Sequence, residues 1–406
     1  MKYSGRSLRI PEETDTMPMF EPSPAPVGQR AKRYGESIYA YYRDSERPGI
    51  LAIRNLLEEW FQEIPEEERL DLQQRFRSPI ERQHRSAVFE LFLHHFLLRC
   101  GFQVEFHPDV LGVTTHPDFL VSRGGQNLFY LEAIAVGNSF REEAETNRMN
   151  QVYDVLNNLQ SPDFYLGMHI DGAPETPPAG ARLRSELSRW LATLNHEEVR
   201  KCYLDERYED IPKYEWNHDG WHVIFEPMPK GDESRSNTSV RPIGMTIPMQ
   251  ARQLTLDESL RDGVAAKDRY GRVALPLVVA IQLVDEFRVE KIDVMNGLFG
   301  QETISVDAEG RTCPGRVPNG AWISPNGPIH RGISAVMAWS TLEPWNFTRI
   351  EPTVVNNPYA SLPLPNDTLP MSQHIVDRQR GVLVEQQGSS MEEIIGLAQD
   401  WCSQFS

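Results

Sequence analysis

Residues 116–136, HPDFLVSRGGQNLFYLEAIAV, constrain the fold of this chain more than any other segment. They read as two β-strands joined by a turn at Gly124-Gly125. Asp118 enters the first strand and Glu132 lies inside the second, in each case among apolar neighbours. Because pairing through such a turn brings residues about fourteen positions apart across from each other, we expect the two carboxylates to lie close together.

Two neighbouring carboxylates on a sheet need a compensating charge. Side chains alternate between the faces of a strand, so Glu132, Ile134 and Val136 share one face. Like charges opposed across strands repel, and a buried unpaired charge costs several kcal/mol. Mg²⁺ (or Mn²⁺) would remove both penalties, because such ions bind one or two carboxylates together with waters and phosphate oxygens.

A third acid interrupts an otherwise apolar helix. The segment SAVFELFLHHFLLRC, residues 86–100, has hardly a polar side, which predicts a largely buried helix that contains Glu90. His94 follows Glu90 by one helical turn. A metal is one partner for this Glu, and a hydrogen bond to His94 or His95 is another.

Simpler interpretations stay open for the hairpin acids as well. A Pro-Asp pair such as Pro117-Asp118 often opens a strand or a turn for structural reasons alone. Glu132 could instead form a salt bridge with an arginine such as Arg148.

The order of elements predicts a mixed α/β protein. We expect a flexible tail over residues 1–35, where Pro, Ser and charged residues dominate, and a helical region over 36–83. Helix, three strands, helix and strand follow within a core at 84–230. A polar stretch at 231–240 predicts a boundary before an α/β C-terminal region at 241–406.

The core resembles the PD-(D/E)XK, or restriction-endonuclease-like, nuclease superfamily. The resemblance covers roughly residues 84–170 and depends on the αβββαβ element order, on Pro117-Asp118, and on the Glu-Ala-Ile run at 132–134. It implies that Glu90, Asp118 and Glu132 bind Mg²⁺. It also implies hydrolysis of phosphodiester bonds in DNA, or alternatively RNA, and a role such as restriction or defence.

One position departs from the family pattern. The family Lys belongs two residues after Glu132, where this chain has Ile134. Members of the superfamily have moved this cation to the following helix, which makes Arg148 and Gln151 the candidate replacements. The alternative is a nuclease-like fold that has lost catalysis and serves as a nucleic-acid-binding or protein-interaction module.

Charge bears on the partners of the chain. A net charge of −17 argues against coating nucleic acid by bulk electrostatics, but it leaves room for a local basic groove. Basic residues before the helix could contact phosphates, or could equally form a solvated helix face; they are Arg75, Arg77, Arg82, His84 and Arg85. His330 and Arg331 open a later strand, where a substrate contact is a further option. Protein partners or a homo-oligomer stay open.

The remaining signals concern cell compartment and other chemistries. Four widely spaced cysteines predict reduced thiols, the N-terminus lacks the apolar core of a signal peptide, and PLVVAIQLV is too short to span a bilayer. We therefore expect a cytoplasmic protein without membrane contact. The sequence contains no P-loop, no His-Glu-x-x-His motif and no Gly-x-Ser-x-Gly motif.

Overall fold

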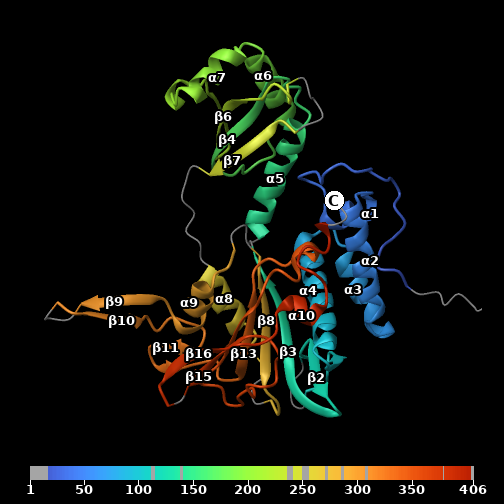
Figure 1. Cartoon of the computed structure of the whole chain (residues 1–406), viewed down its shortest axis with the longest axis vertical. Helices are drawn as coiled ribbons and strands as arrows, with labels where there is room; N and C mark the ends of the chain where they lie inside the picture. Colours follow the sequence, from blue (N-terminus) through green and yellow to red (C-terminus); the bar gives the residue numbers. More distant parts are fainter. Residues whose placement is uncertain are drawn as a thin grey trace, which may run out of the picture. The chain divides into compact units, whose positions relative to one another are not determined.

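The computed structural model describes residues 17–110, 115–137, 140–235, 241–248, 256–269, 273–284, 288–306, 310–377 and 379–403. The chain divides into two compact units. The first contains residues 1–30, 38–136 and 257–406, and the second contains 31–37 and 137–256. Mixed α/β structure, as the sequence predicts, is present in both units (Figure 1).

An eight-stranded mixed sheet forms the centre of the first unit, in the order β1-β2-β3-β8-β13-β14-β15-β16. β1, β2 and β3 form an antiparallel meander, and β3, β8 and β13 run parallel to one another. The strand bounds are β1 Gln103–Phe106, β2 Phe119–Arg123, β3 Gln126–Val136, β8 Leu277–Leu283, β13 Ile333–Trp339, β14 Thr353–Asn356, β15 Gln373–Asp377 and β16 Val382–Gln386.

Helices pack on both faces of this sheet because alternate residues of its central strands are apolar on each side. Phe129 and Leu131 of β3 belong to the core that the N-terminal helices form, whereas Tyr130 belongs to the core beneath α8 and α9. The first set is α1 Ile38–Asp44, α2 Pro48–Gln62, α3 Glu66–Phe76, α4 Glu81–Arg99 and the C-terminal α10 Met391–Ile395. The second set is α8 Leu256–Ala265 and α9 Lys291–Phe299.

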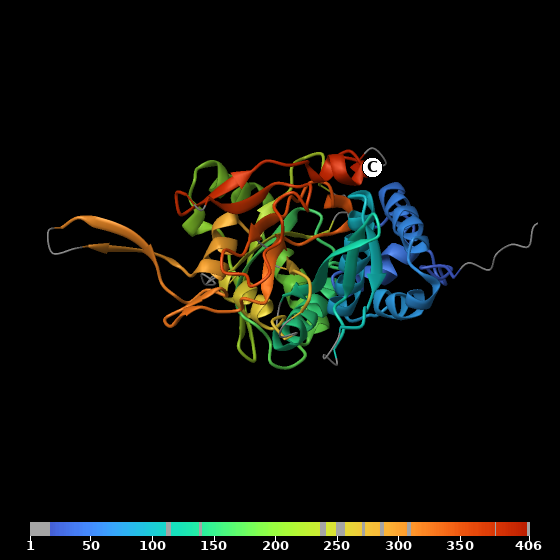
Figure 2. The ribbon, with the colours of Figure 1, turned by 90° about the horizontal axis from the view of Figure 1, so that it is seen from below.

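Short elements complete the first unit. β9 Glu302–Val306 and β10 Thr312–Arg316 form a two-stranded ribbon whose residues are all exposed, and Figure 2 shows it extending away from the sheet. β11 Ile323–Ser324 pairs with β12 Gly327–Pro328, and a 3₁₀ turn covers Pro344–Asn346.

The second unit is a smaller sheet with helices. Its four strands lie in the order β5-β6-β4-β7 and cover Tyr214–His218, Trp221–Pro229, Phe164–Gly172 and Ile243–Pro248. The helices are α5 Phe140–Leu156, α6 Gly180–Leu191, α7 His196–Leu204 and a 3₁₀ turn at Tyr208–Asp210. Residues 31–37 join this unit because the backbone N–H groups of Tyr34 and Gly35 each donate to Asp154 at 2.8 Å.

The domain boundaries therefore differ from those expected at 84–230 and 241–406. The strand expected at the end of the nuclease-like core is β4, and it belongs to the sheet of the second unit. β8 instead lies beside β3. Residues 137–256 are thus an insertion between two adjacent parallel strands. Such long insertions cost little because loop-closure entropy grows slowly with loop length.

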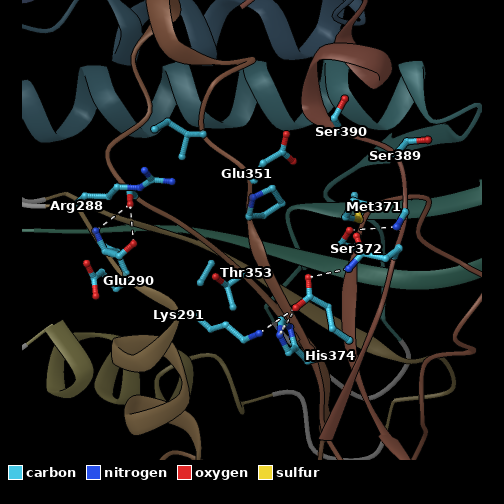
Figure 3. A pocket seen from close by; sticks show the side chains of 18 residues that line it. Arg288, Glu290, Lys291, Glu351, Thr353, Met371, Ser372, His374, Ser389 and Ser390 are labelled. Carbon is cyan, nitrogen blue, oxygen red and sulfur yellow. Dashed lines mark hydrogen bonds and ion pairs between the residues drawn. The ribbon is translucent and has the colours of Figure 1, made fainter.

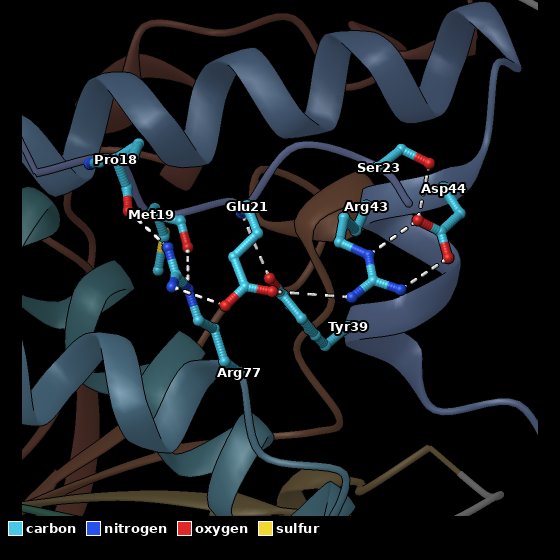
Figure 4. Close-up of polar contacts among 8 residues, drawn as sticks. All are labelled: Pro18, Met19, Glu21, Ser23, Tyr39, Arg43, Asp44 and Arg77. Atoms are coloured by element: carbon cyan, nitrogen blue, oxygen red, sulfur yellow. Dashed lines mark hydrogen bonds and ion pairs between the residues drawn. The ribbon is translucent and has the colours of Figure 1, made fainter. Parts of the chain in front are cut away.

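Part of the expected N-terminal tail is also packed. Met19 and Phe20 are buried in the core of the N-terminal helices. Figure 4 shows how Arg77 holds this segment: its guanidinium donates to the backbone oxygens of Pro18 and Met19, each at 2.8 Å, and pairs with Glu21. Residues 1–16 lie outside the described part of the chain.

Candidate functional site

Asp118 directly precedes β2, and the strand pairing of the following residue fixes its position. Phe119 pairs with Leu131 across the hairpin, so the next position outward places Asp118 opposite Glu132. Gly124 and Gly125 form the turn with φ of +59° and +79°, values that only glycine adopts without strain. Asp118 Oδ2 accepts a 2.6 Å hydrogen bond from the Ala133 N–H. The expected proximity of the two acids is therefore present.

Glu132 is completely buried, on the face of β3 that α8 and α9 cover. Lys267 donates to Glu132 Oε2, and Arg269 Nη2 lies 3.5 Å from Oε1. Burial raises the pKa of Glu132, Asp118 raises it further, and the two cations oppose that shift. Oε1 has no hydrogen-bond partner among the described residues. The salt-bridge interpretation of Glu132 is right in kind, but its partner is Lys267 rather than Arg148.

Lys267 is the residue that the sequence did not predict. It lies in the turn after α8, and its Nζ is 3.9 Å from Asp118 Oδ2 as well as bonded to Glu132. Ile134, at the family's Lys position, packs instead among the apolar residues beneath α8. No short-range signal links Lys267 to Glu132, because 135 positions separate them and only the pairing of β3 with β8 brings them together.

Glu90 belongs to a different environment from Glu132. It lies on α4, which covers the opposite face of the sheet, and both its carboxylate oxygens accept from Arg75 at 2.6 and 2.7 Å. Burial raises the pKa of Glu90, the Arg75 pair lowers it, and Asp118 raises it. The two histidines expected as partners contact other residues: His95 bonds to Glu63, and the His94 ring packs against Phe106 at a tilt of 40°. Asp118 thus raises the pKa of both acids, although they belong to opposite faces of the sheet.

The two candidate replacements for the family Lys lie on α5 in the second unit. Arg148 Nε donates to the Pro174 carbonyl at 2.6 Å, and Gln151 is exposed. Within the first unit, Lys267 supplies the cation beside the acids.

The basic residues before α4 and in its first turns mostly serve the fold. Arg75 pairs with Glu90, Arg77 anchors residues 18–21, and Arg85 pairs with Glu343. His84 is buried, and its Nδ1–H donates to the Phe76 carbonyl, because a carbonyl oxygen can only accept. Burial lowers its pKa to about 4. These contacts remove most of the predicted phosphate-binding surface.

His330 contacts the turn that carries Lys267. Its Nδ1 is 2.9 Å from Asp268 Oδ2, and Asp268 directly follows Lys267 in the chain. His330 has a φ of +47°, the left-handed region that non-glycine residues rarely adopt. The imidazole is therefore held in one orientation by a carboxylate next to the Asp118–Glu132–Lys267 cluster.

Of the three acids predicted to bind a metal ion, Asp118 and Glu132 are the two that could share one divalent cation. The described residues include no group of three or more His, Cys, Asp or Glu side chains placed to hold a metal ion. Glu132 Oε1 is a buried oxygen without a hydrogen bond, and Asp118 is one-quarter exposed. Two carboxylates suffice for Mg²⁺, which keeps several waters. Glu90 lies on the opposite face of the sheet, where both its oxygens already accept hydrogen bonds from Arg75.

Comparison with known proteins assigns no family, since no family model, curated protein or solved structure matches the chain. Four free cysteines agree with the expected reduced thiols. None of the helices in the described part of the chain is long and apolar enough to cross a membrane.

Proposed function

We propose that the first unit is a metal-dependent phosphodiesterase that hydrolyses DNA, with RNA as the alternative substrate. The observation that carries this proposal is Lys267, whose ammonium group bonds to Glu132 and lies 3.9 Å from Asp118. Two acids and a lysine next to each other match the residue types of the nuclease family that the hairpin resembles. The lysine reaches them from the turn after α8 rather than from position 134.

The order of the strands also supports the proposal. A long helix, α4, precedes the meander β1-β2-β3, and α8 leads into β8, which is parallel to β3. This is the helix, three strands, helix and strand order of the resemblance, with α8 and β8 replacing the expected α5 and β4. The second unit is then an insertion in the nuclease-like core.

Each residue of the cluster has a distinct role in this proposal. Asp118 and Glu132 would hold Mg²⁺ or Mn²⁺, which activates water and neutralises charge that develops on the phosphate. Lys267 has three donor hydrogens and bonds to one carboxylate, so it can also donate to a phosphate oxygen. The Ala133 N–H orients Asp118 through its 2.6 Å hydrogen bond.

A binding module without catalysis is the second candidate, and the charge balance favours it. Lys267 and Arg269 compensate Glu132, and Arg75 compensates Glu90, so these buried acids need no metal to be tolerated. A nuclease-like fold that binds nucleic acid or protein would keep the same pairs. Metal binding therefore separates the two candidates.

Calorimetric titration with Mn²⁺ tests the metal site. We expect the wild type to bind, and Asp118→Asn not to bind, because the amide keeps the acceptor for Ala133 N–H but loses the charge. Glu90→Gln is the matched control, which removes one acid that Arg75 already occupies and should leave binding intact. A silent wild type would favour the binding module, and loss of binding in Glu90→Gln would restore Glu90 to the metal set.

Cleavage is then measured on plasmid DNA and on RNA with Mg²⁺. Asp118→Asn should lower the rate by about 100-fold or more, as expected when a main electrostatic contact to the transition state is lost. Glu90→Gln should cleave like the wild type. A wild type that binds Mn²⁺ and retards DNA in a gel, but cleaves neither substrate, would refute the catalytic proposal.

A further inference from the structure

A polar pocket of about 690 Å³ lies on the other half of the large sheet, and its lining includes none of the acids at 90, 118 and 132. Its wall comes from the ends of several strands: Ser340 follows β13, Thr353 begins β14, His374 lies in β15 and Glu385 in β16. Lys291, at the start of α9, closes one side. The volume falls in the range of small-molecule sites.

A buried histidine in the lining, His374, lies against Glu385. His374 is 8% exposed, and its Nδ1 lies 3.1 Å from the Val354 carbonyl, which only accepts, so Nδ1 carries a proton. Burial lowers the pKa of His374, which keeps the ring neutral at pH 7 and leaves a lone pair on Nε2. Nε2 has no hydrogen bond among the described residues, and Glu385 Oε2 is 3.6 Å away. Because Nε2 has almost no accessible surface, His374 shapes the wall of the pocket and does not offer a hydrogen bond to a ligand.

The charged groups of the pocket divide into paired and free ones. Lys291 bonds to Glu385 at 3.0 Å, and Glu290 caps α9. Arg288 forms no hydrogen bond or ion pair with any part of the chain that the structure describes, and its side chain lines the pocket in Figure 3. A guanidinium of this kind binds phosphate through two parallel hydrogen bonds.

The acids of the lining limit how much negative charge a ligand can bring. Glu351 accepts a 2.9 Å hydrogen bond from the Met391 N–H through Oε1, and burial raises its pKa. Its second oxygen has no hydrogen bond with the residues that the structure describes, and Thr353 and Ser389 add hydroxyl groups to the same lining. One anionic group and several hydroxyls therefore match the pocket better than a polyphosphate or a bare phosphate ion.

We infer that this pocket binds a phosphorylated sugar, either free or as part of a nucleoside monophosphate. Arg288 binds the phosphate, and the free oxygen of Glu351 together with the hydroxyls of Thr353 and Ser389 bonds to the sugar hydroxyls. The inference goes beyond the proposed function and does not depend on it, because it concerns different residues and is measured without nucleic acid.

Titration calorimetry with the full chain tests the site with four probes: ribose 5-phosphate, AMP, ribose and inorganic phosphate. We expect ribose 5-phosphate, AMP or both to bind, and ribose and phosphate alone to bind at least about tenfold more weakly, since each makes only part of the contacts. Binding of both phosphorylated probes would indicate the free sugar phosphate as a sufficient ligand, and binding of AMP alone would indicate the nucleotide.

Two variants locate the site. Arg288→Ala should weaken binding by about tenfold or more, because a hydrogen-bonded charge pair is lost. Arg380→Ala is the matched control, since Arg380 is a largely exposed arginine at the turn between β15 and β16, the end of that hairpin opposite the pocket. No binding of either phosphorylated probe, phosphate binding as tight as ribose 5-phosphate binding, or equal affinity in the two variants would each overturn the inference.

Discussion

Single residues decide whether the buried acids of this protein are tolerated. Glu132 has no exposed surface and lies beside Asp118, and both features raise its pKa. Lys267, which bonds to it, and Arg269, 3.5 Å away, oppose that rise. A buried ion pair of this kind contributes little by itself, but removing one partner leaves the other charge buried and uncompensated. Lys267 is therefore important for stability, whatever its role in catalysis.

Lys267→Met should lower the free energy of unfolding at pH 7 by about 3–5 kcal/mol, the usual cost of breaking a buried pair. The folded-state pKa of Glu132 is already raised above 4.5, so its ionisation costs stability as pH rises through the folded-state pKa. Without Lys267 this pKa rises further, and the loss is largest at pH 7 and shrinks toward pH 4.5. Urea unfolding at several pH values measures the effect.

The double variant Glu132→Gln/Lys267→Met provides the control. It removes both charges, so it should recover most of the stability that Lys267→Met loses and should lack its pH dependence. If the double variant is as unstable as the single one, the loss comes from packing of the lysine side chain and not from the orphaned carboxylate.

At the scale of elements, the backbone around Gly320 crosses close to the backbone at the end of α9, and this contact positions the segment that follows the helix. Gly320 packs against the end of that helix, where an added Cβ would lie 2.4 Å from both Gly300 N and Leu298 O. The same segment donates from Ala321 N to Gly297 O and from Trp322 N to Leu298 O, which places the buried Trp322 under α9. A methyl group at position 320 cannot fit without moving this crossing.

Gly320→Ala should therefore destabilise the protein by about 1–3 kcal/mol through overpacking. Gly315→Ala is a matched control in the exposed β10 strand, where the nearest neighbour of an added Cβ is a side-chain methyl at 3.7 Å. Thermal unfolding followed by Trp fluorescence compares the two variants. Equal midpoints for both would show that the crossing relaxes without cost.

At the scale of the whole molecule, the two units have separate cores. The core of the second unit consists of residues between Met149 and Ile243, with Trp221 at its centre. Trp339 packs against Phe89, Phe92 and Phe96 in the first unit. Each unit therefore has the apolar interior that an independently folding domain needs.

Differential scanning calorimetry should resolve two transitions that respond to different substitutions. Trp221→Ala should lower only the transition of the second unit, and Trp339→Ala only that of the first, each through a loss of about 3–5 kcal/mol for a buried aromatic side chain. Trp345→Ala, at a position 41% exposed, should move neither. A single transition that shifts with both buried substitutions would mean that the units unfold together.

The sequence by itself determined the local structure and one half of the candidate site. Alternating apolar residues and the Gly-Gly turn specify β2 and β3, and the turn register brings Asp118 opposite Glu132, because both signals act within twenty residues. These features depend on backbone geometry and side-chain periodicity, which short segments encode.

Only the tertiary structure decided the partners of those acids. Lys267 reaches Glu132 because β8 pairs with β3 across a long insertion, and Arg75 reaches Glu90 because α3 packs on α4. Strand pairing at such separation, and the choice of which cation compensates a buried charge, depend on the packing of the whole unit. The sequence showed that the acids needed compensation, and the fold selected the residues that provide it.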